Sequence, residues 1–128
     1  MLGYLTIGAN DLPRSERFYT AILAPLGYGK AEQEDGVAYT LPDSPAVYVK
    51  KPFDGREATV GNGSMIAFRV PTHAELRALH SAGIAAGGTD EGAPGFRAQY
   101  SSNFFVGYLR DPLGNKLALF CTAVDRAA

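Results

Sequence analysis

The sequence has few of the features of disulfide-bonded, membrane-spanning or secreted proteins. One residue of 128 is a cysteine, so Cys121 has no partner for a disulfide within the chain, and we expect a reducing compartment, the cytoplasm. No apolar run approaches the ~18 residues of a membrane span. The opening residues MLGYLTIG carry no basic region, so neither a membrane segment nor a secretory leader is expected.

An excess of charge of one sign is also absent. Lysine and arginine together number 12 against 13 for aspartate and glutamate, which gives a formal net charge of -1. This balance gives no reason to expect a nucleic-acid partner. The apolar fraction of 46% and the charged fraction of 20% are typical of a globular chain and exclude disorder over its whole length. The length suits a single domain.

The residues that are present repeat one order of elements. Alternation in residues 4–8 predicts a half-buried strand, and Asp11 and Pro13 predict the start of a helix. Three short strands are expected after this helix, near residues 28–32, 37–41 and 46–50.

The same order returns in the second half. Residues 65–70 alternate as a strand, and Thr72 with Glu75 forms a capping box that predicts a helix running to Gly87 and Gly88. We interpret the glycine-rich segment 87–92 as a turn. Three more strands are expected near residues 97–100, 104–110 and 116–121.

The sequence therefore predicts one α+β domain, residues 1–128, that consists of two βαβββ modules. The modules cover residues 1–51 and 63–123, and a polar, glycine-containing linker at 52–62 joins them. Each four-stranded sheet would have one face covered by its helix and the other face left to line a shared space. Tyr4 and Met65 open the first strand of each module, 61 positions apart.

Three segments in the right order resemble the vicinal oxygen chelate superfamily, which contains glyoxalases, bleomycin-resistance proteins, fosfomycin-resistance enzymes and extradiol dioxygenases. They are Thr6–Leu12 followed by Ser15 and Phe18-Tyr19, then Ile66–Val70, then Arg110–Leu117 with its Asp-Pro-Leu-Gly-Asn turn. The resemblance covers essentially the whole chain. It implies modules that curl around an open cleft, usually in a homodimer. In the enzymatic members it also implies a divalent metal that stabilises an enolate or oxyanion.

The positions where the resemblance places the metal ligands hold unsuitable residues here. Family histidines correspond to Tyr4 and Met65, and the family glutamate corresponds to Ala118. A divalent ion of the Zn, Mn, Fe or Ni type needs three or four imidazole or carboxylate ligands. A phenol, a thioether and a methyl group do not supply them. We therefore expect no metal and no other cofactor.

Ligands from elsewhere in the chain do not replace the missing ones. The two histidines, His73 and His80, are seven residues apart on the second predicted helix, which separates their backbones by roughly 10 Å at ~1.5 Å per residue. We expect both histidines to be exposed, and we expect Cys121 to be a small buried hydrophobic residue. Arg110 is interpreted as a structural partner of the turn that follows it.

The family ligand positions are taken to mark the cleft side of each sheet, and the alternation of side chains along each strand then predicts which other residues line the cleft. They combine aromatic and apolar groups with a few cations and hydroxyls, which suits a flat or amphipathic small molecule that carries an anionic group. The candidates are Tyr4, Thr6, Tyr48, Lys50, Met65, Arg69, Arg97, Phe104, Val106, Tyr108, Ala118 and Phe120. An alternative is that Met65, Phe104 and Phe120 only fill space and that Arg69 and Lys50 are surface charges.

Three functions remain open. The leading hypothesis is a metal-free protein of the glyoxalase type that binds a small organic molecule and dimerises. The second is an active lyase, isomerase or dioxygenase with relocated ligands or with Tyr4, Tyr108 and Arg69 as participants, although no catalytic residue can be assigned. The third is sequestration of a cationic drug, which a net charge of -1 attracts only weakly.

Overall fold

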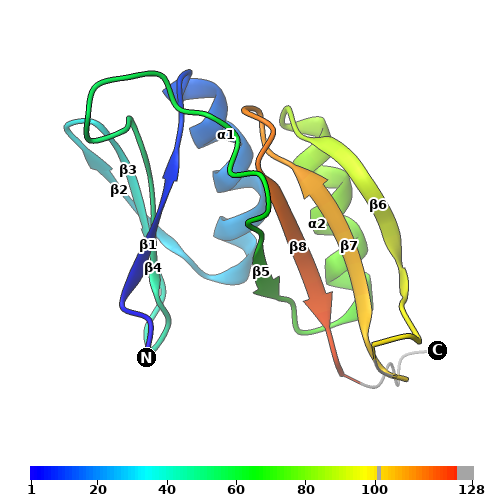
Figure 1. The fold of residues 1–128 in the computed structure, drawn as a ribbon. Helices are drawn as coiled ribbons and strands as arrows, with labels where there is room; N and C mark the ends of the chain where they lie inside the picture. The colour runs from blue at the N-terminus through cyan, green and yellow to red at the C-terminus, as the bar shows by residue number, and fades with distance from the viewer. Residues whose placement is uncertain (101, 124–128) are drawn as a thin grey trace.

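The computed structural model describes residues 1–100 and 102–123, and in this part of the chain two four-stranded mixed sheets and two α-helices form an α+β fold (Figure 1). Sheet A belongs to the first module and contains β1 (Tyr4–Gly8), β2 (Gly29–Gln33), β3 (Gly36–Thr40) and β4 (Ala46–Lys50). Sheet B belongs to the second and contains β5 (Ile66–Arg69), β6 (Thr89–Phe96), β7 (Phe105–Arg110) and β8 (Lys116–Cys121).

The two sheets have the same topology. The strand order is β1-β4-β3-β2 in sheet A and β5-β8-β7-β6 in sheet B. In each sheet the first strand pairs in parallel with the last strand of its module, and the remaining pairs are antiparallel. The repeat predicted from the sequence is confirmed, and it leaves β1 and β5 at the edges of their sheets.

Helix α1 (Leu12–Leu23) begins as predicted. The Asp11 side chain accepts a hydrogen bond from the backbone amide of Arg14 at 3.2 Å, which satisfies one of the free amides of the first turn. Its apolar stripe is fully buried and includes Phe18, Tyr19 and Ile22. A 3-10 turn, η1 (Ala24–Leu26), follows and ends at Gly27 in the left-handed conformation.

Helix α2 (His73–Ala85) starts at the predicted Thr72 cap, whose hydroxyl oxygen accepts from the Glu75 amide at 3.1 Å. The predicted exposure of its histidines is wrong, because His73 and His80 are 6% and 5% exposed. Their spacing of seven residues places both on the stripe of α2 that also contains Leu76 and faces the sheet. Neither helix of the described residues is long and apolar enough to cross a membrane.

The strand predicted at residues 97–100 is also wrong. The corresponding strand, β6, spans Thr89–Phe96, and residues 98–100 form a turn. Most of the glycine-rich segment that we interpreted as a turn is therefore strand. An edge strand tolerates glycine and Pro94 because one of its sides lacks a partner, and shifts of register accompany Gly92 and Gly95.

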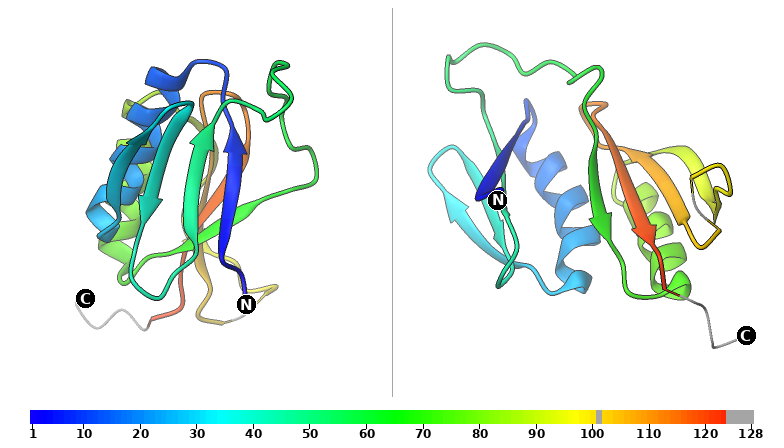
Figure 2. Two further views of the ribbon diagram at one scale, coloured as in Figure 1. Left: turned by 90° about the vertical axis from the view of Figure 1, so that its left-hand side faces the viewer. Right: turned by 60° about the horizontal axis from the view of Figure 1, so that its bottom comes forward.

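The two modules pack through their helices. Helix α1 lies between sheet A and the second module, and α2 covers one face of sheet B (Figures 1 and 2). An Arg17 guanidinium nitrogen of α1 donates to the Ala85 carbonyl oxygen of α2 at 3.4 Å. One continuous hydrophobic core results, with residues from both modules. The helix-free face of each sheet is consequently turned outward.

The linker is held against the start of α1. The Asn10 side-chain amide donates to the Ala58 carbonyl oxygen at 3.0 Å, and its oxygen accepts from the Ala58 amide at 2.7 Å. This pair of bonds substitutes for the backbone partners that Ala58 would find in a sheet. The asparagine of the first recognised segment therefore has a structural role.

Candidate functional site

The helix-free face of sheet A, which we name outer face A, carries the candidates of the first module. Tyr4, Thr6, Tyr48 and Lys50 alternate with residues that point to α1, and Val47 of this second set is buried. The Tyr4 ring meets the Tyr48 ring edge-on at 5.5 Å between centroids. Tyr4 is nevertheless 66% exposed, so this aromatic pair is open to a partner or a ligand.

The helix-free face of sheet B, which we name outer face B, carries most candidates of the second module. The register brings Ala67, Ala118 and Tyr108 into one row and Arg69, Phe120 and Val106 into the next. Phe104 precedes β7 and stacks on Phe120 at 5.9 Å between centroids. Met65 lies at the edge of this face and is 48% exposed.

Outer face B also holds cations above its aromatic rings. The Arg69 guanidinium carbon lies 4.7 Å from the centre of the Phe120 ring. The Lys116 ammonium lies 4.8 Å, and the Arg97 guanidinium carbon 5.8 Å, from the centre of the Tyr108 ring. These distances are typical of cation–π contacts, so the structure brings Arg97 to the other candidates although it lies outside the strands.

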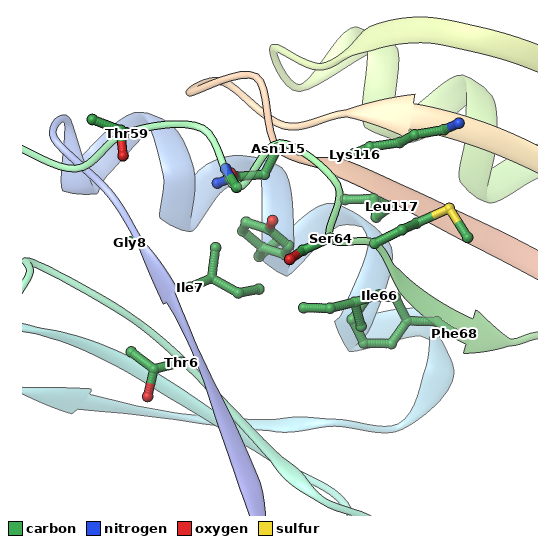
Figure 3. Close-up of a pocket in the computed structure, with 13 residues that line it drawn as sticks. Thr6, Ile7, Gly8, Thr59, Ser64, Ile66, Phe68, Asn115, Lys116 and Leu117 are labelled. Atoms are coloured by element: carbon green, nitrogen blue, oxygen red, sulfur yellow. The ribbon is translucent and has the colours of Figure 1, made fainter.

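The two outer faces do not meet within one chain. In Figure 1 sheet A is seen nearly edge-on and sheet B nearly face-on, with α1 between them. Figure 3 shows the consequence for the side chains: Thr6 of outer face A and Lys116 of outer face B extend in different directions, away from the space that Ile7 and Ile66 face. Thr6 and Met65 both line the cavity between β1 and β5, whereas the other candidates of each module form a group of their own.

A cavity of about 230 Å³ lies between the edges of β1 and β5 and extends inward to Tyr19 of α1 (Figure 3). Its apolar residues are Ile7, Met65, Ile66, Phe68 and Leu117, and its polar ones are Thr6, Tyr19, Thr59, Ser64, Asn115 and Lys116; Gly8 and Gly61 complete it. These residues were not predicted as a group, because strands β1, β5 and β8 contribute them together with the linker, helix α1 and the turn before β8, and no period links these segments.

The Tyr19 hydroxyl, beside this cavity, is committed to the structure. It donates to Oδ2 of the buried Asp111 at 2.6 Å. Burial raises the pKa of the Tyr19 phenol well above its ordinary value, and the neighbouring Asp111 carboxylate raises it further. The phenol therefore stays protonated as a donor and does not serve as a base at neutral pH.

Solved structures decide the family. A glyoxalase/bleomycin resistance protein from Albidiferax ferrireducens T118 is 37% identical to this chain and superposes with a TM-score of 0.85, over 94% of this chain and 98% of that one. This chain belongs to the glyoxalase/bleomycin resistance protein family. That identity over nearly the whole length of both chains confirms the resemblance found in the sequence.

Solved structures of lower sequence identity share the fold of this glyoxalase/bleomycin resistance family protein. A glyoxalase-related enzyme from Fulvimarina pelagi is 20% identical with a TM-score of 0.75, over 94% of this chain and 87% of that one. A glyoxalase/bleomycin resistance protein/dioxygenase family enzyme from Burkholderia phytofirmans PsJN is 16% identical with a TM-score of 0.73, over 94% of this chain and 98% of that one. No protein-family model matches the sequence, and no curated protein matches it.

The positions where the family implies a metal do not fit one in this member. Tyr4 lies on outer face A, and Met65 and Ala118 lie on outer face B, where they offer a phenol, a thioether and a methyl group. In the described part of the chain no three histidine, cysteine, aspartate or glutamate side chains gather closely enough to hold an ion. The donor set is therefore unsuited to the hard or borderline divalent ions of the family.

The remaining titratable candidates have structural contacts. His80 places Nε2 3.0 Å from the Tyr108 carbonyl oxygen. Cys121 is buried as predicted, and its Sγ lies 3.5 Å from the Pro71 carbonyl oxygen. Arg110 donates to the Gly114 carbonyl oxygen at 3.0 Å, which confirms its predicted role beside the turn.

Proposed function

We propose that this protein binds a small organic molecule on its outer faces and does so without a metal ion. The proposal rests on Tyr4, Met65 and Ala118, which stand at the positions where the resemblance places the ligands, and on the aromatic side chains of the same two faces. Tyr4 and Met65 are open to solvent at these positions, and aromatic and thioether groups suit organic ligands better than ions.

Two copies of the chain would complete the binding site. One chain leaves outer face A and outer face B uncovered and pointing in different directions. Strands β1 and β5 both lie at the edges of their sheets, and such edges favour association with another chain. A homodimer in which outer face A of one copy meets outer face B of the other would enclose the ligand.

Sequestration of a cationic drug is less compatible with the same surface. Arg69, Arg97 and Lys116 stand over the rings of outer face B. Three positive charges repel a cationic ligand at short range, whereas they do not disfavour a neutral or anionic one.

The cytoplasm is the compartment that we propose for this activity. Cys121 is the one cysteine of the chain and is buried. A fold that relies on no disulfide suits a reducing environment.

A spectroscopic screen tests the proposal. Small aromatic and aliphatic acids, amides and amines are added to ¹⁵N-labelled protein, and amide resonances are followed. We expect shifts in β1, β4, β5, β7 and β8. Replacing the exposed Ala67 of outer face B by phenylalanine should fill the surface and weaken binding about tenfold, or ~1.4 kcal/mol.

The matched control is Ala85→Phe, at an exposed position near the end of α2, which should leave binding unchanged. Light scattering of the same samples should give the mass of two 13.6 kDa chains. Shifts confined to the cavity between β1 and β5, equal loss of binding in the two variants, or the mass of a single chain at micromolar concentration would contradict the proposal.

A further inference from the structure

Outer face B concentrates positive charge on a nearly neutral protein. Arg69, Arg97 and Lys116 make no ion pair with any described residue, although the chain as a whole has a net charge of -1. The ion pairs found between described residues are Lys30–Glu16, Lys50–Asp35, His80–Asp90 and Arg110–Glu91. The three cations of outer face B are thus available to an external anion.

Contacts with the protein hold these cations close to the face. An Arg69 nitrogen donates to the Thr122 hydroxyl at 2.8 Å. Arg97 donates to the carbonyl oxygens of Ala93 and Phe96 at 3.1 and 3.3 Å. Each guanidinium has five N–H donors, so both arginines retain donors for a ligand while their position is already restricted.

Strand β6 leaves space for the Arg97 side chain. A Cβ atom at Gly95 would lie 3.1 Å from Nη1 of Arg97, and one at Gly92 would lie 3.6 Å from its Nη2. The absence of a side chain at Gly95 leaves room for the guanidinium to lie across β6 and reach the Tyr108 ring, and the absence of one at Gly92 leaves room for that ring, which a Cβ atom would approach to 2.9 Å. Gly92 and Gly95 therefore leave space for the Tyr108 and Arg97 side chains of outer face B.

A flat apolar surface lies beside the cations. Ala67 and Ala118 are neighbours across β5 and β8. The Ala67 methyl group is exposed, whereas Ala118 is only 2% exposed among its neighbours. Phe120 and Phe104 stack with an interplanar angle of 28°, and the exposed Tyr100 meets Phe104 edge-on at 5.8 Å. This surface accommodates the plane of an aromatic or conjugated system.

We propose that outer face B recognises a planar aromatic carboxylate, an inference that rests on the proposed small-molecule function and specifies the charge and shape of the ligand. The ring lies against Ala67 and Phe120, and Arg69, which stands over Phe120, binds the carboxylate. Lys116, over the Tyr108 ring, adds positive charge from the other end of the row. Guanidinium and ammonium groups form charge-assisted hydrogen bonds with carboxylates, and the aromatic plane supplies the apolar contact.

Three probes with one ring system and different charge test this inference: 2-naphthoate, 2-naphthamide and 2-naphthylmethylammonium. Titration calorimetry should show 2-naphthoate binding at least about tenfold more tightly than the amide, with the ammonium compound weakest. The double variant Arg69→Gln/Lys116→Gln should lose at least about tenfold in affinity for 2-naphthoate and less than about twofold for the amide.

The control variant Arg56→Gln/Lys51→Gln removes the same charges from exposed positions and should keep full affinity for 2-naphthoate. Equal affinity of the acid and the amide, or an equal loss in the two double variants, would overturn the inference. If the amide and the ammonium compound bind outer face B as well as the acid and Ala67→Phe weakens all three, the proposed function stands while the anion preference fails. If none of the probes binds, the inference fails, and the spectroscopic screen decides the proposed function separately.

Discussion

Replacing Asp111 by alanine should lower the free energy of unfolding by about 3–5 kcal/mol. Oδ1 of this buried carboxylate accepts hydrogen bonds from the backbone amides of Leu113, Gly114 and Asn115 at 2.9–3.0 Å. Oδ2 accepts from the Tyr19 hydroxyl at 2.6 Å and from the Asn115 side chain at 3.2 Å. Alanine would leave these donors without their acceptor, and urea unfolding followed by circular dichroism measures the loss.

Two further variants show which bonds matter. Asp111→Asn retains an oxygen for the three amides but replaces the one that faces Tyr19, so we expect a smaller loss of roughly 1–3 kcal/mol. Asp54→Ala removes an exposed carboxylate that accepts from the Arg56 amide at 3.0 Å and should cost less than about 0.5 kcal/mol. A loss below about 1 kcal/mol for Asp111→Ala would show that the carboxylate does not anchor the hairpin to α1.

Replacing Gly88 by alanine should destabilise the protein by about 3 kcal/mol. A Cβ atom at this position would overlap the Phe18 ring of α1, and it would lie 2.9 Å from the Gly83 carbonyl oxygen and 3.0 Å from the Arg110 carbonyl oxygen. Two of the three neighbours are backbone atoms, and the Phe18 ring is fully buried. None of them can move without disturbing the contact between the modules.

Gly29→Ala is the matched control for this substitution. Its Cβ atom would make ordinary contacts with Thr40 at 3.9 Å, so its effect on the free energy of unfolding should stay within about 1 kcal/mol. If Gly88→Ala is as stable as Gly29→Ala under urea, the first helix does not pack against the second module within one chain. The outer faces would then have a different arrangement.

Local patterns predicted most of the fold. The alternation of residues 4–8, the Asp11 cap and the Thr72 cap correspond to β1 and to the starts of both helices. These features depend on neighbours in the sequence, where a period of two or a capping oxygen is visible. Which strands pair within each sheet was not predicted, because periodicity alone does not determine it.

The errors arose where tertiary contacts override local preference. Glycine and proline between residues 87 and 95 indicated a turn, but β6 lies at an edge and tolerates them. His73 and His80 were expected to be exposed because histidine is polar, yet their spacing follows the buried stripe of α2. His73 stacks on Phe105 at 4.3 Å, a contact between residues distant in the sequence.

The arrangement of the candidate site also depends on tertiary contacts that local sequence patterns do not reveal. Alternation identified which side chains share a sheet face, such as Thr6 with Tyr48 and Ala118 with Phe120. The direction in which each face points follows from how α1 packs against the second module, and this depends on Gly83 and Gly88 allowing Phe18 to approach. No short-range pattern marks that approach, so the separation of the two outer faces was not predicted.

Metal content tests most directly the claim that this family member works without an ion. The protein is purified without chelators and dialysed in turn against Zn²⁺, Ni²⁺ and Mn²⁺, and the bound metal is measured by elemental analysis. The triple variant Tyr4→His/Met65→His/Ala118→Glu serves as the comparison, because it restores the family donors where outer face A of one copy meets outer face B of the other in the proposed homodimer. We expect less than about 0.1 ion per chain in the natural protein and substantially more in the variant. Close to one ion per chain in the natural protein, lost on Tyr4→Phe or Met65→Leu, would contradict the account.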